Sequence, residues 1–204
     1  MRNRVLLGLA MGYAGIVVIG PVLNNKLADV YGLSFTASMP LLAIAYILLD
    51  VVANQWGKRE ARTVVLCALI VRMVVYLLFI PGILALPASR EPAGFSGLFH
   101  QALRNFISGE GANFLFQFVV AVPAFVWLRD RMQGRWFVLR YLVITVPILV
   151  MQTSANVIGS YAFVPGVDMV TLVTGQATMK LLFSVAAWPL AFIANRVVGT
   201  VHAD

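Results

Sequence analysis

The chain has 204 residues, of which 61% are hydrophobic and only 11% are charged. Soluble domains have about a quarter charged residues, so this composition excludes a soluble globular protein and indicates an integral membrane protein. The formal net charge of +7 does not indicate nucleic-acid binding, because the basic residues cluster in short segments between apolar runs, as membrane topology requires.

The apolar runs predict six membrane-spanning helices. Each span needs about twenty apolar residues, so the length leaves almost no room for an extramembrane domain. The predicted spans cover residues 5–23, 38–53, 62–86, 111–128, 136–158 and 169–198. The start of the chain resembles a secretory signal, but no small-residue cleavage site leads into a soluble domain, so we interpret it as the first span. The predicted fold is a single all-α transmembrane domain over residues 1–204.

The connections between these spans are short and polar. Gly20-Pro21 is expected to break or kink the end of the first span. We expect a short loop at residues 24–34 and a basic loop at 54–61. The longest polar stretch, residues 87–101, is predicted to hold a short interfacial helix that reaches Asn105. A polar loop at residues 129–134 and a turn at 160–168 complete the set.

The positive charges predict the orientation. If the amino terminus is cytoplasmic, most basic residues fall on that side or at its boundary: Arg2, Arg4, Lys58, Arg59, Arg62, Arg129, Arg131, Arg135, Arg140 and Arg196. Only Lys26, Arg90 and Arg104 fall on the other side. This asymmetry is what the positive-inside rule predicts for six spans with both termini in the cytoplasm.

Several polar residues remain inside the predicted spans. They are Asp50 in the second, Arg72 in the third, Gln117 in the fourth, Gln152 and Asn156 in the fifth and Lys180 in the sixth, with Glu110 and Asn113 at the outer start of the fourth. In hydrocarbon each must face a partner or a wet cavity, and one shared central cavity explains them together. Two alternatives stay open: Asp50 forms a structural ion pair with Arg72 or a loop arginine, and the amides only join helices.

Prolines inside three spans support a central cavity. Pro123, Pro147 and Pro189 lie in the fourth, fifth and sixth spans. Each removes a backbone donor and disturbs the carbonyls of the preceding turn, and discontinuous helices near the midplane are one way to build a transport site. The alternative is that the prolines only shape helix packing.

Catalytic and metal-binding patterns are missing from the sequence. The histidines are His100 and His202, in a loop and at the tail, and the one cysteine is Cys67 in an apolar run. No His, Cys and carboxylate cluster has metal-ligand spacing, and neither a nucleophile elbow nor a glycine-rich phosphate loop is present. We therefore predict a protein that is not an enzyme and has no cofactor.

Residues 48–62, LLDVVANQWGKREAR, carry a resemblance to a known family. An acid at the end of an apolar helix, a glycine, a lysine and an arginine beyond it resemble the signature of the queuosine-precursor transporter family, also called the vitamin uptake transporter-like group. The matching residues are Asp50, Gly57, Lys58, Ala61 and Arg62, with Lys26 and Gly32 upstream. Further matches are Arg104, Ser108 and Gln117, the loop from Leu128 to Trp136, Gln152 with Phe163, and Lys180 with Pro189.

The resemblance implies a six-helix importer in the bacterial cytoplasmic (inner) membrane. Its small-molecule cargo would be a 7-deazaguanine with a cyano or aminomethyl group. Such a ring has adjacent N–H donors that a carboxylate or an amide can accept. The candidate binding residues are Asp50, Arg72, Glu110, Gln117, Gln152, Asn156 and Lys180, with Tyr46 as an aromatic face for stacking. The chain departs from the family pattern at Pro21, Asn54, Val120 and Ala155, which leaves another small heterocycle or vitamin open as cargo.

Two other functions remain open at this point. One is the substrate-binding membrane subunit of an energy-coupling-factor vitamin transporter, which needs ATPase partners. The small residues Ala10, Ala14 and Gly15 would then form a docking face for a partner helix. The other is a structural or assembly protein in which the polar residues only join helices. The sequence does not decide whether the protein forms a homo-oligomer.

Overall fold

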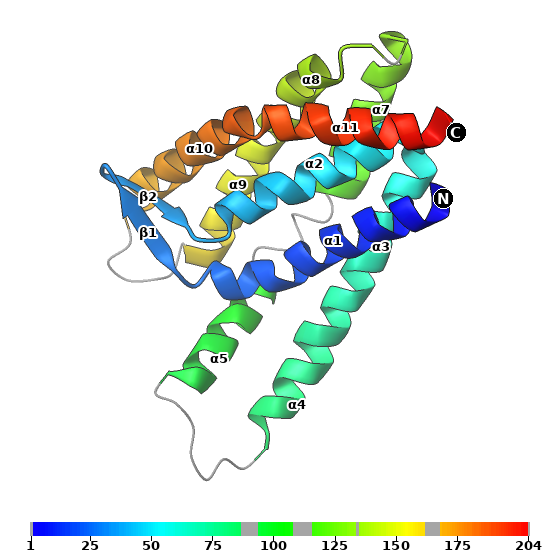
Figure 1. Ribbon diagram of the computed structural model, residues 1–204. Coiled ribbons are helices and arrows are strands. Elements are labelled where there is room, and N and C mark those ends of the chain that lie inside the picture. The colour runs from blue at the N-terminus through cyan, green and yellow to red at the C-terminus, as the bar shows by residue number, and fades with distance from the viewer. Residues whose placement is uncertain (1, 87–93, 108–115, 134, 162–167, 204) are drawn as a thin grey trace.

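The computed structural model describes residues 2–86, 94–107, 116–133, 135–161 and 168–203. In Figure 1 three rows of helix run side by side: α1 (Arg2–Leu23), α2 (Met39–Gln55), and α10 (Met169–Ala186) followed nearly in line by α11 (Trp188–Ala203). A long helix descends across α1 and consists of α3 (Lys58–Val74), the π-helical turn η1 (Val75–Phe79) and α4 (Ile80–Leu84).

The remaining helices pack behind and beside these rows. Helix α5 (Phe95–Asn105) rises beneath α1 (Figure 1). The next helix comprises η3 (Phe116–Ala121) and α7 (Val122–Arg131). A further helix comprises α8 (Phe137–Arg140), η4 (Tyr141–Thr145) and α9 (Val146–Tyr161). The predicted mainly helical fold is confirmed, and so is a short helix ending at Asn105.

Three helices in the described part of the chain are long and apolar enough to cross a membrane: Asn3–Leu23, Lys58–Leu84 and Met169–Ala186. Met39–Gln55 and Phe137–Gln152 are shorter apolar helices. The count of six spans and their orientation therefore stay predictions. Figure 1 does place the start of α1 and the end of α11 at the same end of the bundle, as an even number of spans requires. We call this the termini end.

The opposite end carries a β-hairpin where the sequence predicted a loop. Strands β1 (Leu27–Val30) and β2 (Leu33–Thr36) pair antiparallel, with Val30 opposite Leu33. The connecting residues Tyr31 and Gly32 both have positive φ, and the Asp29 carboxylate accepts hydrogen bonds from the Gly32 N–H and the Ser34 hydroxyl. The prediction of a loop was therefore wrong. The sequence did not indicate a hairpin, because Tyr-Gly is not one of the strong hairpin signals. We call this the hairpin end.

The hairpin rests directly on α10. A Cβ added to Gly175 of α10 would collide with the backbone oxygen of Ser34 on β2. The absence of a side chain at this position lets the strand and the helix approach backbone to backbone. Phe35 adds an edge-to-face contact with Phe183 of α10. The hairpin is thus part of the packed bundle.

Helix α2 lies at the centre of the bundle and contacts α1, α3, α7, α10 and α11. A helix that is apolar all round is expected to be buried on all sides, and most residues from Met39 to Ala53 fit that expectation, with Pro40 and Ile44 exposed. It ends at Gln55, only Trp56 and Gly57 separate it from α3, and Gly57 adopts a positive φ. The basic loop predicted at 54–61 is therefore largely helical, and Lys58 to Arg62 form the first turns of α3.

The prediction that prolines interrupt regular helix is confirmed for some of them, and the break expected at one is wrong. Pro81, Pro123 and Pro147 each follow a π-helical turn by two residues, after η1, η3 and η4. A widened turn accommodates the missing N–H and the ring of a proline inside a helix, and such turns are frequent at functional sites. Pro189 is the second residue of α11, just after the break between α10 and α11 at Ala187. Gly20-Pro21 was expected to break or kink the first span; the break is wrong, because α1 continues through Pro21 to Leu23, and the kink stays a prediction.

Candidate functional site

A small cavity lies in the middle of the bundle. Its polar lining comes from five helical segments, one residue from each: Tyr13 of α1, Tyr46 of α2, Arg72 of α3, Gln117 of η3 and Gln152 of α9. All five side chains are buried. Val17, Leu42, Val65, Ala68 and Leu69 complete the wall. Convergent polar groups in an otherwise apolar cavity are the usual makeup of a small-molecule site.

The two glutamines and Tyr46 are joined by hydrogen bonds. The Tyr46 hydroxyl donates to the Gln152 side-chain oxygen at 3.0 Å, and the Gln117 amide nitrogen donates to the same oxygen at 3.4 Å. One acceptor therefore binds two donors from two other helices. Gln117 lies within η3, so the π-helical turn sets the direction of its side chain. The structure thus brings three of the predicted site residues together.

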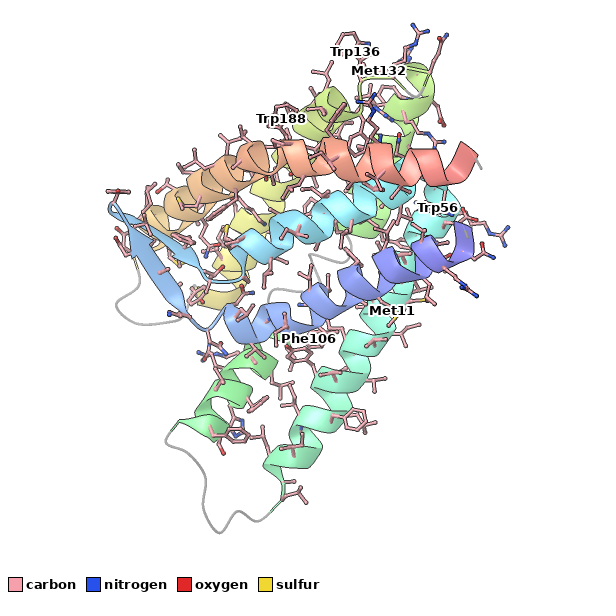
Figure 2. All side chains as sticks on the ribbon, viewed as in Figure 1. Met11, Trp56, Phe106, Met132, Trp136 and Trp188 are labelled. Carbon is pink, nitrogen blue, oxygen red and sulfur yellow. The ribbon has the colours of Figure 1, made fainter. Side chains whose placement is uncertain are left out.

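Arg72 forms another wall of the cavity. Its guanidinium lies over the Phe106 ring at 5.5 Å from the centroid, and Phe106 also stacks on Tyr76 at 5.0 Å. Phe106 follows the end of α5, where that helix meets the underside of α1 (Figure 2). A cation over an aromatic face gains electrostatic stabilisation, which suits a charge in an apolar surrounding.

The cavity has a volume of about 40 Å³. At about 10–15 Å³ per water this admits a few water molecules. It does not admit a fused bicyclic ring. A ligand of that size requires the surrounding helices to separate, and the π-helical segments η1, η3 and η4 are places where their backbones depart from regular α-helical geometry.

Lys180 and Asp50 lie near Tyr46 but do not line the cavity. The Lys180 ammonium of α10 is 5.8 Å from the centroid of the Tyr46 ring, and the side chain is buried away from the lipid-facing surface. Asp50 follows Tyr46 by one turn of α2 and is buried. It lies within electrostatic range of Arg140 and Tyr141. The predicted residues therefore occupy two neighbouring regions, the cavity around Gln152 and a polar region around Asp50.

Two buried hydroxyl groups accompany Asp50. Tyr141 of η4 and Ser184 of α10 are both 0% exposed and lie near each other. Within the described part of the chain, neither hydroxyl forms a hydrogen bond of normal geometry. Together they add two hydroxyl groups to the polar region that holds Asp50. The sequence analysis did not select either residue, because hydroxyl groups are common in membrane helices.

Two of the predicted site residues cannot be placed. Glu110 lies outside the described residues. Asn156 lies on α9 one turn beyond Gln152, but its side chain also lies outside the described part.

Arginines close the termini end of α2. The Arg129 Nη1 atom donates to the backbone oxygens of Ala53 and Asn54, at 2.9 and 3.2 Å, and so satisfies carbonyls that the helix end leaves open. Arg140 Nη2 donates to the Asn54 side chain at 2.8 Å. The Asn54 amide in turn donates to Asn195 of α11 at 2.7 Å. Arg140 is fully buried, so its charge lies inside the bundle.

A second polar network closes the hairpin end. Ser38 donates a hydrogen bond to the Asn24 side chain and also contacts the Thr36 hydroxyl at 3.1 Å. Tyr161, at the end of α9, donates to the Asn24 backbone oxygen at 2.8 Å. Asn105 of α5 donates to Asn25 at 2.8 Å. The cavity thus lies between two polar closures that tie different helices together.

These features define a helical integral membrane protein with a buried polar cavity. The family model described as "Putative vitamin uptake transporter" matches residues 36–194, most of the chain. The protein therefore belongs to this family. It is the queuosine-precursor transporter family that residues 48–62 were found to resemble. Its members are transporters and not enzymes. Comparisons with curated proteins and with solved structures give no match.

Proposed function

We propose that the protein imports a queuosine precursor, 7-cyano- or 7-aminomethyl-7-deazaguanine, across the bacterial inner membrane. The observation that carries this proposal is the convergence of Tyr46 and Gln117 on Gln152 at the cavity between the helices. Amides both donate and accept, so they can recognise the mixed donor and acceptor edge of a deazaguanine ring. That the protein is a transporter follows from its family.

The polar region around Asp50 supports a cargo rich in N–H groups. A carboxylate accepts two adjacent N–H donors with charge-assisted hydrogen bonds, and the hydroxyls of Tyr141 and Ser184 add donors or acceptors beside it. In this proposal Tyr46 stacks on the ring, and Gln117 and Gln152 bind one edge while Asp50 binds the other. The helices around the cavity separate to admit the ring, since the volume of about 40 Å³ is too small.

The two closures support an alternating-access cycle. With the termini end in the cytoplasm, the Asn24 and Ser38 network closes the outer side and Arg129 with Asn54 closes the inner side. Import then requires each network to open in turn while the other holds. Both are built from hydrogen bonds between different helices, which can break without loss of either helix.

The test is uptake of each precursor into cells that lack their own synthesis and transporter, read as queuosine in tRNA. We expect the wild-type chain to restore queuosine and a Gln152→Leu chain, inserted to the same level, to restore little. Failure of both precursors with normally inserted protein would exclude this cargo. Uptake that needs co-purifying ATPase subunits would support the energy-coupling-factor alternative.

A further inference from the structure

A groove on the outer surface of the bundle lies between α1 and α3 at the termini end. It has a volume of about 540 Å³, much larger than the central cavity. Its wall is mostly apolar and includes Leu7, Met11, Cys67 and Val71, all exposed on the surface of the bundle. Figure 2 shows Met11 on α1 beside the crossing with α3. A groove of this kind in a membrane protein faces acyl chains.

A basic cluster adjoins the groove at the start of α3. Lys58, Arg59 and Arg62 line a second hollow of about 420 Å³, together with Thr63, Leu66 and Phe118. Arg59 and Thr63 line both hollows, so the apolar groove and the basic cluster are continuous. Among the residues that line the two hollows, the one acid is Glu60, so the lining has a positive excess.

The cations of this cluster are available to an anion. Lys58 and Arg59 are exposed, and no ion pair joins Lys58, Arg59 or Arg62 to a carboxylate among the residues that the structure describes. Arg62 is held in place by its hydrogen bond to the Phe118 backbone oxygen at 3.2 Å and by the Phe118 ring at 4.8 Å. Its remaining guanidinium donors can still face an anion.

We propose that this groove and cluster form a binding site for an anionic phospholipid. The phosphate lies against Lys58, Arg59 and Arg62, and one acyl chain lies in the groove between α1 and α3. The charge complementarity selects an anionic headgroup, because basic residues at a membrane surface attract anionic lipids and a zwitterionic lipid gains little from them. The bound lipid would bridge α1 and α3, two of the helices that line the transport cavity.

Cys67 provides a direct probe of occupancy, because it is the one cysteine of the chain and it lines the groove. The rate of its modification by N-ethylmaleimide is measured on the full chain in detergent while phosphatidylglycerol or phosphatidylcholine is added. We expect phosphatidylglycerol to slow modification about tenfold and phosphatidylcholine, at the same mole fraction, less than about twofold.

Matched variants assign the headgroup site. Lys58→Gln with Arg59→Gln is expected to weaken the phosphatidylglycerol effect by about tenfold or more in half-maximal concentration. Arg131→Gln with Arg196→Gln removes the same charge from exposed arginines that lie over Trp127 and Phe192 and do not line the groove, and should leave the effect unchanged.

Three results would overturn the proposal. Equal protection by both lipids means that the headgroup is not recognised. Full phosphatidylglycerol protection in the Lys58 and Arg59 double variant means that the anion binds elsewhere. Protection by soluble glycerol phosphate at the same concentrations means that the site binds a phosphate group without a lipid chain.

Discussion

The hydroxyl of Tyr46 on α2 donates a hydrogen bond to the side-chain oxygen of Gln152 on α9, at 3.0 Å and across 106 positions of the chain. Gln117 donates to the same oxygen from a third helix. These two hydrogen bonds therefore depend on the relative positions of α2, η3 and α9 around the cavity. Any change of those positions during transport must alter it.

The first prediction concerns Gln117 and Gln152. Changing either residue to Leu should weaken ligand binding by about 1–3 kcal/mol, because buried donors lose their partner, while the protein still inserts and folds. Gln152→Leu should have the larger effect, since its oxygen accepts from both Tyr46 and Gln117. The measurement is ligand affinity of purified protein, with Tyr46→Phe as the variant that removes one donor alone. Unchanged affinity in both Leu variants would assign the amides to helix packing.

A second prediction concerns Asp50. Asp50→Asn keeps the shape and removes the charge, so we expect normal insertion but little uptake, because the buried carboxylate can no longer exchange a cationic or N–H partner. Asp29→Asn is the control: Asp29 is exposed on β1, and the amide oxygen can still accept from the Gly32 N–H. Uptake is normalised to inserted protein. Loss of folding in Asp50→Asn would instead indicate a structural ion pair.

Arg129 is predicted to stabilise the closure at the termini end. Arg129→Gln removes the hydrogen bonds to the Ala53 and Asn54 backbone oxygens and should lower stability by about 1 kcal/mol, since the residue is partly exposed and solvent replaces some of the loss. Arg131→Gln is the matched control, because Arg131 lies over the Trp127 ring on the outside of α7. Thermal unfolding in detergent compares the two. Equal melting temperatures for the two variants would remove Arg129 from the closure.

Gly175 is predicted to be required for the docking of the hairpin. Gly175→Ala places a Cβ against the Ser34 backbone, with the Ser34 nitrogen at 2.9 Å, so α10 and β2 must move apart. Overpacking of this kind costs about 1–3 kcal/mol. Gly8→Ala is the control, because nothing lies within 4 Å of a Cβ at Gly8. The melting temperature should fall for Gly175→Ala and hold or rise for Gly8→Ala; the reverse order would contradict the close packing.

Asp168 is predicted to make the first turn of α10 sensitive to acid. The Thr171 hydroxyl, together with the backbone N–H groups of Thr171 and Val170, holds the pKa of the Asp168 carboxyl below its usual 3.8. A lowered folded-state pKa stabilises the protein above the unfolded-state value, and this stabilisation is lost as the pH falls through the folded-state pKa. Asp168→Asn keeps a capping acceptor but does not titrate.

The measurement for Asp168 is the melting temperature of both chains over an acid series. The advantage of the wild-type chain over Asp168→Asn should be largest above pH 4 and should shrink below it. A difference that does not vary with pH would show that the charge of Asp168 contributes nothing to the cap.

The sequence alone determined the class of the protein and the positions of most helices. Whether a segment is apolar enough for a membrane depends on its own residues, so composition predicted an integral membrane protein, and the residues from Asp50 to Arg62 were sufficient to identify the family later shown by the match. The same reasoning selected Gln117, Gln152 and Lys180 as buried, because a polar group inside an apolar run is costly unless it turns inward.

Only the tertiary structure decided which of these groups meet. Tyr13 lines the cavity, and Tyr141 and Ser184 lie in the polar region near Asp50, only because distant helices pack together; nothing in their local sequence distinguishes them from hydroxyls that face a neighbouring helix. Likewise, the hairpin from Leu27 to Thr36 depends on the bare surface of Gly175, far along the chain. Hydrophobicity is a local property of the chain, whereas cavities and closures are set by contacts between segments that are distant in sequence.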